Sequence, residues 1–125
     1  MSGLRRVGRL PLDLSRIKAR YRSIVASIET VGIGTAQKTR ILFKDGSYLD
    51  IWFSESGRYS FHWERQHIDG KLFRFDNAPH HSGVKTFPHH LHNGSEEKVT
   101  ESWIDPRPDR AVLQVLDFIK MKLSV

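Results

Sequence analysis

From residue 22 to residue 76, hydrophobic and polar side chains alternate with a period of two, which is typical of strands with one buried face. The clearest run is YSFHWERQ, residues 59–66, in which three aromatic residues alternate with polar ones. Asp-Gly pairs at 45–46 and 69–70 interrupt the pattern and are typical of hairpin turns. These residues therefore predict an antiparallel meander of about four strands, whose expected core aromatics include Trp63, Phe73 and Phe75.

Apolar residues recur at helical spacing in two other segments, one near each end of the chain. The first predicts a short helix from Ser15 to about Ser23. The second, residues 110–123, follows two prolines and predicts a longer helix with Asp109 as its N-cap. A short strand is predicted in VTESWI, before those prolines. The expected fold class is α+β, an antiparallel meander of four to six strands with the C-terminal helix on one face and a short N-terminal helix.

The composition fits one soluble domain. The chain has 125 residues, enough to bury its own core. It contains no cysteine, which excludes disulfides and thiolate metal sites. No segment reaches the length of apolar sequence that crosses a bilayer, and no signal-peptide core follows the basic N-terminus. We therefore expect a cytoplasmic protein with no membrane association.

The net charge of +6 is concentrated at the N-terminus. The first 22 residues carry seven basic side chains and one acidic one, whereas basic and acidic side chains balance in the rest of the chain. We expect residues 1–14 to form a basic arm and residues 15–125 to form a single α+β domain. Such arms contact polyanions or acidic partners, or else are simply solvated. The candidates for contact with nucleic acid in this arm are Arg5, Arg6 and Arg9.

Five histidines lie within DNAPHHSGVKTFPHHLH, residues 76–92. They form two His-His pairs, each preceded by a proline, and a fifth histidine follows the second pair. The prolines stiffen the backbone that leads into each pair. Imidazole exchanges protons near neutral pH, and two imidazoles can act as general base and general acid at one phosphodiester. This segment, which reads as a loop, therefore predicts a functional site.

The chemistry that this segment fits best is metal-independent hydrolysis of RNA. One imidazole would take the 2′-hydroxyl proton, and another would protonate the leaving 5′-oxygen. Neighbouring side chains of an extended backbone point in opposite directions, so at most one of His80 and His81 should reach a shared pocket, with one or two of His89, His90 and His92. Of these we favour His81 and His90. Asp76 would orient one of the rings, as carboxylates do for catalytic histidines. The candidate catalytic residues are His81, His90, His80, His92 and Asp76.

Two arginines on neighbouring predicted strands are the candidates for binding phosphate. If Asp69-Gly70 forms a two-residue turn, Arg65 lies directly opposite Arg74. Like charges in that arrangement are unfavourable. Either the register is different, or an anion such as an RNA phosphate lies between the two side chains, and both alternatives stay open.

Two other functions also stay open. In the first, the histidine segment is a structural clasp, and the protein binds a partner protein or nucleic acid without catalysis. In the second, the histidines and Asp76 bind a metal, since His90 and His92 share one face if the chain is extended there, and His89 and His92 do so if it is helical. No HExxH motif supports a metal, and the main expectation is a site without metal or other cofactor.

The segment from Phe61 to His92 resembles the TumE family of toxin–antitoxin proteins. The resemblance rests on His62-Trp63, on the turn at Asp69-Gly70, and on the motifs DNAPHH and TFPHHLH. It is close over about thirty residues and looser over the preceding hairpins and the C-terminal helix. It implies the toxin half of a two-gene module, with a small DNA-binding antitoxin as partner. The RNA substrate is inferred from the histidines, and the oligomeric state, including a homodimer, stays open.

Overall fold

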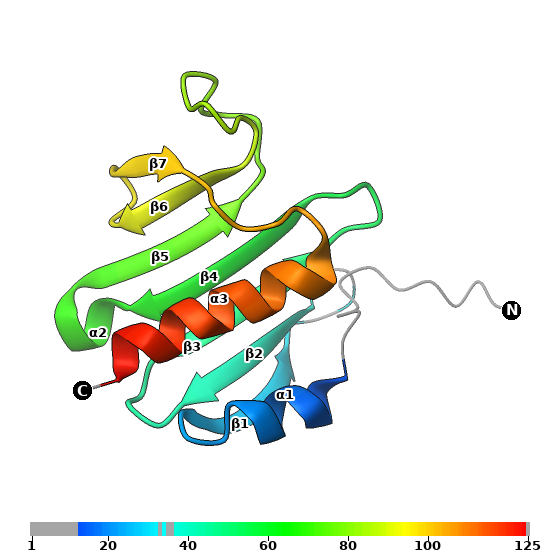
Figure 1. Cartoon of the computed structure of the whole chain (residues 1–125), viewed down its shortest axis with the longest axis vertical. Helices are drawn as coiled ribbons and strands as arrows, with labels where there is room; N and C mark the ends of the chain where they lie inside the picture. Colours follow the sequence, from blue (N-terminus) through cyan, green and yellow to red (C-terminus); the bar gives the residue numbers. More distant parts are fainter. Residues whose placement is uncertain (1–12, 33, 35–36, 125) are drawn as a thin grey trace, which may run out of the picture.

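The computed structural model describes residues 13–32, 34 and 37–124, and the body of this described part is a seven-stranded antiparallel sheet (Figure 1). The strands are β1 (Val25–Val31), β2 (Lys38–Phe43), β3 (Tyr48–Phe53), β4 (Tyr59–Arg65), β5 (Lys71–Asp76), β6 (His90–Gly94) and β7 (Val99–Glu101). Each strand pairs with the next one along the chain, so the whole sheet is a meander. The predicted α+β class and meander are confirmed, whereas the predicted count of four to six strands is too low.

The described helices are α1 (Leu14–Arg20), α2 (Gln66–Asp69) and α3 (Pro108–Leu123). As predicted, α3 lies across one face of the sheet, and α1 lies beside β1 (Figure 1). The first residue of α3 is Pro108, with Arg107 rather than Asp109 as its N-cap, because proline suits the first turn of a helix. None of the helices in the described residues has the length and apolar character that would let it cross a membrane.

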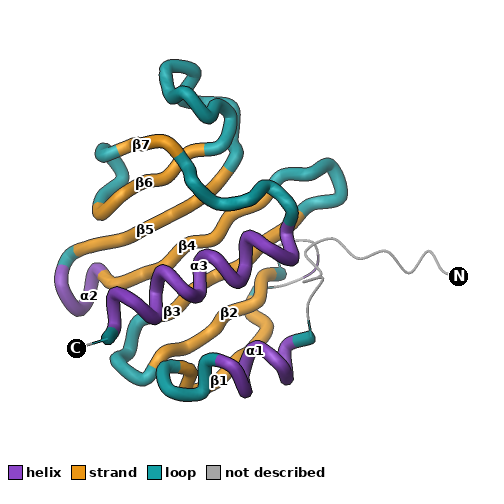
Figure 2. The backbone as a smooth tube through the Cα atoms, viewed as in Figure 1, coloured by secondary structure: helices purple, strands orange, loops and turns teal. Residues whose placement is uncertain are grey.

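The core lies between the sheet and α3. Trp63, Phe73 and Phe75 are buried there, as the alternating pattern predicted. Phe118 of α3 meets all three rings, at centroid distances of 6.1, 5.5 and 5.9 Å. Side chains at the alternate strand positions point to the opposite face, over which Figure 2 shows no described helix. We refer to this side as the helix-free face.

The connection between β4 and β5 differs from the prediction. Instead of a two-residue turn at Asp69-Gly70, the chain forms the short helix α2, which ends at Gly70 in the left-handed region with φ 77°. The resulting register pairs Arg65 with Lys71, and His62 with Arg74. The predicted opposition of Arg65 and Arg74 is therefore wrong, and a different register is the alternative that holds.

The end of the histidine segment is a strand and not a loop. Residues 90–94 form β6, which pairs His90 with Asp76 and His92 with Arg74 on β5. These paired positions all fall on the helix-free face, because the core side of the same strands carries Phe75 and Leu91. Strand β6 thus brings two histidines next to the carboxylate that ends β5.

Candidate functional site

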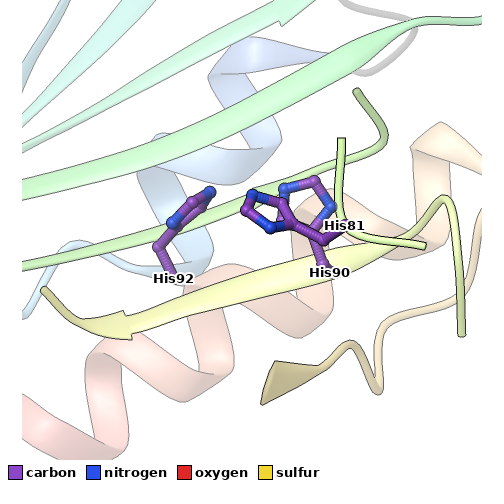
Figure 3. A group of neighbouring side chains, drawn as sticks. All are labelled: His81, His90 and His92. Atoms are coloured by element: carbon purple, nitrogen blue, oxygen red, sulfur yellow. The ribbon is translucent and has the colours of Figure 1, made fainter. Parts of the chain in front are cut away.

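Three imidazole rings converge on the helix-free face (Figure 3). His90 and His92 share one side of β6 because they are two positions apart, and His81 comes from the loop between β5 and β6. The centroid of the His81 ring lies 4.7 Å from that of His90 and 5.5 Å from that of His92. The centroids of the His90 and His92 rings are 5.0 Å apart. We refer to His81, His90 and His92 as the histidine cluster.

Asp76 borders two rings of the cluster. Its Oδ1 atom lies 3.0 Å from Nε2 of His90, and its Oδ2 atom lies 3.7 Å from Nε2 of His92. The same carboxylate accepts a hydrogen bond from the backbone N–H of Ala78 at 2.9 Å, an Asx-type turn that shapes the start of the loop. One carboxylate therefore connects the floor of the cluster to the segment that carries His81.

Backbone carbonyls fix the other nitrogen of two rings. Nδ1 of His90 lies 2.9 Å from the carbonyl oxygen of Pro88, and Nδ1 of His92 lies 2.8 Å from that of Glu96. A carbonyl oxygen only accepts, so each Nδ1 carries a proton and donates it. Burial lowers the pKa of His92 and outweighs the carbonyl of Glu96, which acts in the opposite direction. In the neutral form of such a ring, Nε2 keeps a lone pair.

Arg74 connects Asp76 to the loop after β6. Its guanidinium donates to both carboxylate oxygens of Glu96, at 2.8 and 2.6 Å, and its Nε donates to Asp76 at 3.1 Å. The same guanidinium lowers the pKa of the Glu96 carboxyl. One cation is therefore shared between two carboxylates at the edge of the cluster.

An open cleft of about 510 Å³ lies over the cluster. Beyond the cluster and Asp76, its walls include Trp52, Arg58, Ser60, Arg74, His80 and Glu96. His90 and His92 form a buried floor, with 1% and 5% of their surfaces exposed. His81 is half-buried and His80 is exposed, so these two rings are the ones that a ligand in the cleft would meet first. A more enclosed hollow between α1 and α3 is lined by no histidine.

Asn77 anchors the loop that carries His80 and His81. Its Oδ1 atom accepts from the backbone N–H of Tyr59 at 2.9 Å, and its Nδ2 atom donates to the carbonyl of Gly57 at 2.8 Å. The loop is thereby tied to the turn that precedes β4, on the side where the cleft opens.

Replacing Asn77 by alanine is expected to lower the free energy of unfolding by about 1–3 kcal/mol, because the partly buried N–H of Tyr59 loses its acceptor. Urea unfolding followed by fluorescence measures this change. Asn77→Asp keeps an acceptor for Tyr59 but loses the donor to Gly57, so its loss should be smaller. An Asn77→Ala protein as stable as the wild type would contradict this anchoring role.

All the histidines and the carboxylate predicted as catalytic candidates line the same cleft, namely His80, His81, His90, His92 and Asp76. The expectation that at most one of His80 and His81 would reach it is therefore wrong. Arg74 also reaches it, whereas Arg65 lies at the far end of β4, where it bonds to Asp45 at 2.6 Å and to Asp69 at 3.0 Å. The arm residues Arg5, Arg6 and Arg9 lie outside the described residues.

Sequence reasoning missed several side chains of the cleft, among them Trp52, Arg58 and Glu96. The alternation along β3 carries a usable indication for Trp52, because this residue falls between the core positions Ile51 and Phe53 and so points to the helix-free face. Arg58 and Glu96 belong to segments that read only as polar turns, and no local pattern distinguishes them.

The family model described as Toxin TumE matches residues 14–123. That span begins with the first residue of α1, ends with the last residue of α3, and contains every residue named in the walls of the cleft. No curated protein and no solved structure matches the chain. Because the match covers most of its length, the chain belongs to the TumE toxin family.

Proposed function

We propose that this toxin is an endoribonuclease whose reactive centre is the cleft over the histidine cluster. The observation that carries the proposal is the convergence of His81, His90 and His92 with Asp76 in one open cleft. When RNA is cut by its own 2′-hydroxyl, that hydroxyl must lose a proton, the leaving oxygen must gain one, and the phosphate must be stabilised. The cleft holds groups of the types that these steps require.

Exposure assigns the roles within the cleft. We assign His80 and His81 to contact with the substrate, because they are the more exposed of the histidines that line the cleft. The His90 side chain is only 2% exposed, so we assign it, with His92 and Asp76, to positioning the groups above it. This assignment changes the pair His81 and His90 predicted from the sequence, in which both rings meet the substrate.

The walls of the cleft suit a ribonucleotide. Arg58 supplies positive charge toward a phosphate, and Arg74 also lines the cleft, where Glu96 and Asp76 share its charge. Trp52 lies on the helix-free face of β3 and lines the same cleft, where an indole offers a flat surface for stacking a base. Recognition of single-stranded RNA usually combines these two kinds of contact.

The toxin family suggests an antitoxin as partner, and we propose that this antitoxin is a small DNA-binding protein. A nuclease that attacks cellular RNA needs a neutralising partner in the cell that makes it.

The purified protein is expected to cut a single-stranded RNA and to leave the DNA of the same sequence intact, because DNA lacks the 2′-hydroxyl. Gel electrophoresis of end-labelled oligonucleotides measures both reactions. A 2′-O-methyl group at the cleaved nucleotide should protect that site alone. Equal cutting of RNA and DNA would contradict the proposed reaction. Binding of RNA or antitoxin without any cleavage, by a protein that still arrests growth, would instead support the non-catalytic binding module.

A further inference from the structure

We propose that His81, His90 and His92, together with Asp76, form a binding site for a divalent transition-metal ion. The ligand atoms that the three rings offer lie within 4.8 Å of one another, and Figure 3 shows the rings gathered around one small space. The inference concerns metal binding by this chain and does not depend on RNA cleavage.

The hydrogen bonds of His90 and His92 prepare their rings for a metal. Each ring donates its Nδ1 proton to a backbone carbonyl, that of Pro88 or that of Glu96. In a neutral ring Nε2 is then unprotonated, and its lone pair can bind a metal ion. Metal-bound histidines usually have the same arrangement, with the second ring nitrogen donating to a carbonyl or carboxylate that fixes the ring.

The carboxylate of Asp76 lies where it can provide a fourth ligand. Its two oxygens lie 3.0 Å from Nε2 of His90 and 3.7 Å from Nε2 of His92. With metal–ligand bonds of about 2.0–2.2 Å, two ligand atoms of a tetrahedral site are about 3.3 Å apart. The two Asp76 contacts lie on either side of that value, and ring nitrogens as far apart as 4.8 Å would have to approach each other by about 1.5 Å around the ion.

The local charges favour a cation at this place. The lone pair on Nε2 of His90 and the carboxylate of Asp76 would repel each other unless a positive charge lay between them. Two carboxylates, Asp76 and Glu96, share the single guanidinium of Arg74, so these three groups leave an excess of one negative charge. Either a metal ion or an added proton on His90 would compensate that charge, and the experiment below separates the two.

The donor set indicates which ions fit. Three imidazoles and one carboxylate are typical ligands for Zn²⁺ and neighbouring first-row ions, whereas Mg²⁺ and Ca²⁺ prefer sites made of oxygens. The chain has no cysteine, so thiolates do not compete for the ion. His81 is half-buried and lines the open cleft, which gives the ion a route from solvent.

The test uses full-length, tag-free protein that has been depleted of metal with a chelator and then titrated with ZnCl₂ in a calorimeter. We expect saturable binding of one Zn²⁺ per chain and a melting temperature that rises with the Zn²⁺ concentration. His81→Ala removes one ligand from a loop and should weaken binding at least about tenfold. Its melting temperature without metal reports whether the variant still folds.

His67→Ala is the matched control, because His67 is an exposed histidine on α2 that lies outside the cleft. Its affinity for Zn²⁺ should equal that of the wild type. Absence of saturable binding, or equal affinity in a folded His81→Ala protein, overturns the metal site. RNA cleavage by a protein that binds no Zn²⁺ would also overturn the metal site, but it would support the metal-independent ribonuclease predicted from the sequence. Zn²⁺ binding with no RNA cleavage would support the metal site and count against the ribonuclease.

Discussion

Replacing His81 by alanine is expected to abolish the growth arrest caused by the toxin and to slow RNA cleavage by about 100- to 10,000-fold. His81 is the member of the histidine cluster that is open to the cleft, and its ring touches those of His90 and His92. Both proposed chemistries, proton exchange by imidazole and an ion held by imidazole, need this ring. Viable counts after induction measure the arrest, and the labelled RNA assay measures the rate.

Thermal melting distinguishes a chemical role of His81 from a role in a structural clasp. A half-buried ring on a loop contributes little to folding, so the metal-free His81→Ala protein should melt close to the temperature of the metal-free wild type while losing its toxicity. A clasp would instead lose stability and toxicity together. The His67→Ala protein should remain fully toxic. Full toxicity of the His81→Ala protein would remove the cleft from the mechanism.

Replacing Phe75 by alanine is expected to lower the free energy of unfolding by about 3–5 kcal/mol. Phe75 is 1% exposed, and its ring meets those of Trp103 and Phe118 edge-on at 5.2 and 5.9 Å. Truncation leaves a cavity between the sheet and α3 that the surrounding rings fill only in part. A domain is typically stable by about 5–15 kcal/mol, so this loss would leave much of the protein unfolded at moderate temperature. Chemical denaturation gives the value directly.

The contrast for this variant is Met121→Ala on the same helix that covers Phe75. Met121 is 66% exposed, so its truncation should change stability by no more than about 0.5 kcal/mol. Similar losses for the two variants would mean that the core does not lie between β5 and α3.

Much of the fold follows from local patterns, because alternation marks strands wherever one face is buried. The two Asp-Gly pairs show the limit of such patterns. The first lies in the hairpin between β2 and β3, as predicted, whereas the second ends α2. Glu64 accepts the backbone N–H of Gln66 at 2.8 Å at the start of that helix, an interaction that the pair itself does not encode.

The site was predictable in its residue types but not in its assembly. Histidine, asparagine and glycine make HLHNG a weak strand sequence, and β6 exists because β5 offers it a partner. The convergence of His90 with Asp76 depends on that pairing, which joins residues fourteen positions apart. The bond between Arg74 and Glu96 spans 22 positions and is equally invisible to a local pattern.

Strand β5 places Phe75 and Asp76 side by side in the chain but on opposite sides of the sheet. If the strand slipped by one residue, the carboxylate would enter the apolar interior and the phenyl ring would stand among the imidazoles. Insertion or deletion of one residue within β5 would therefore damage folding and chemistry together. The exposed turn around Gly83, which lies between the two His-His pairs, is free of this constraint, and natural length variation in such toxins should collect there.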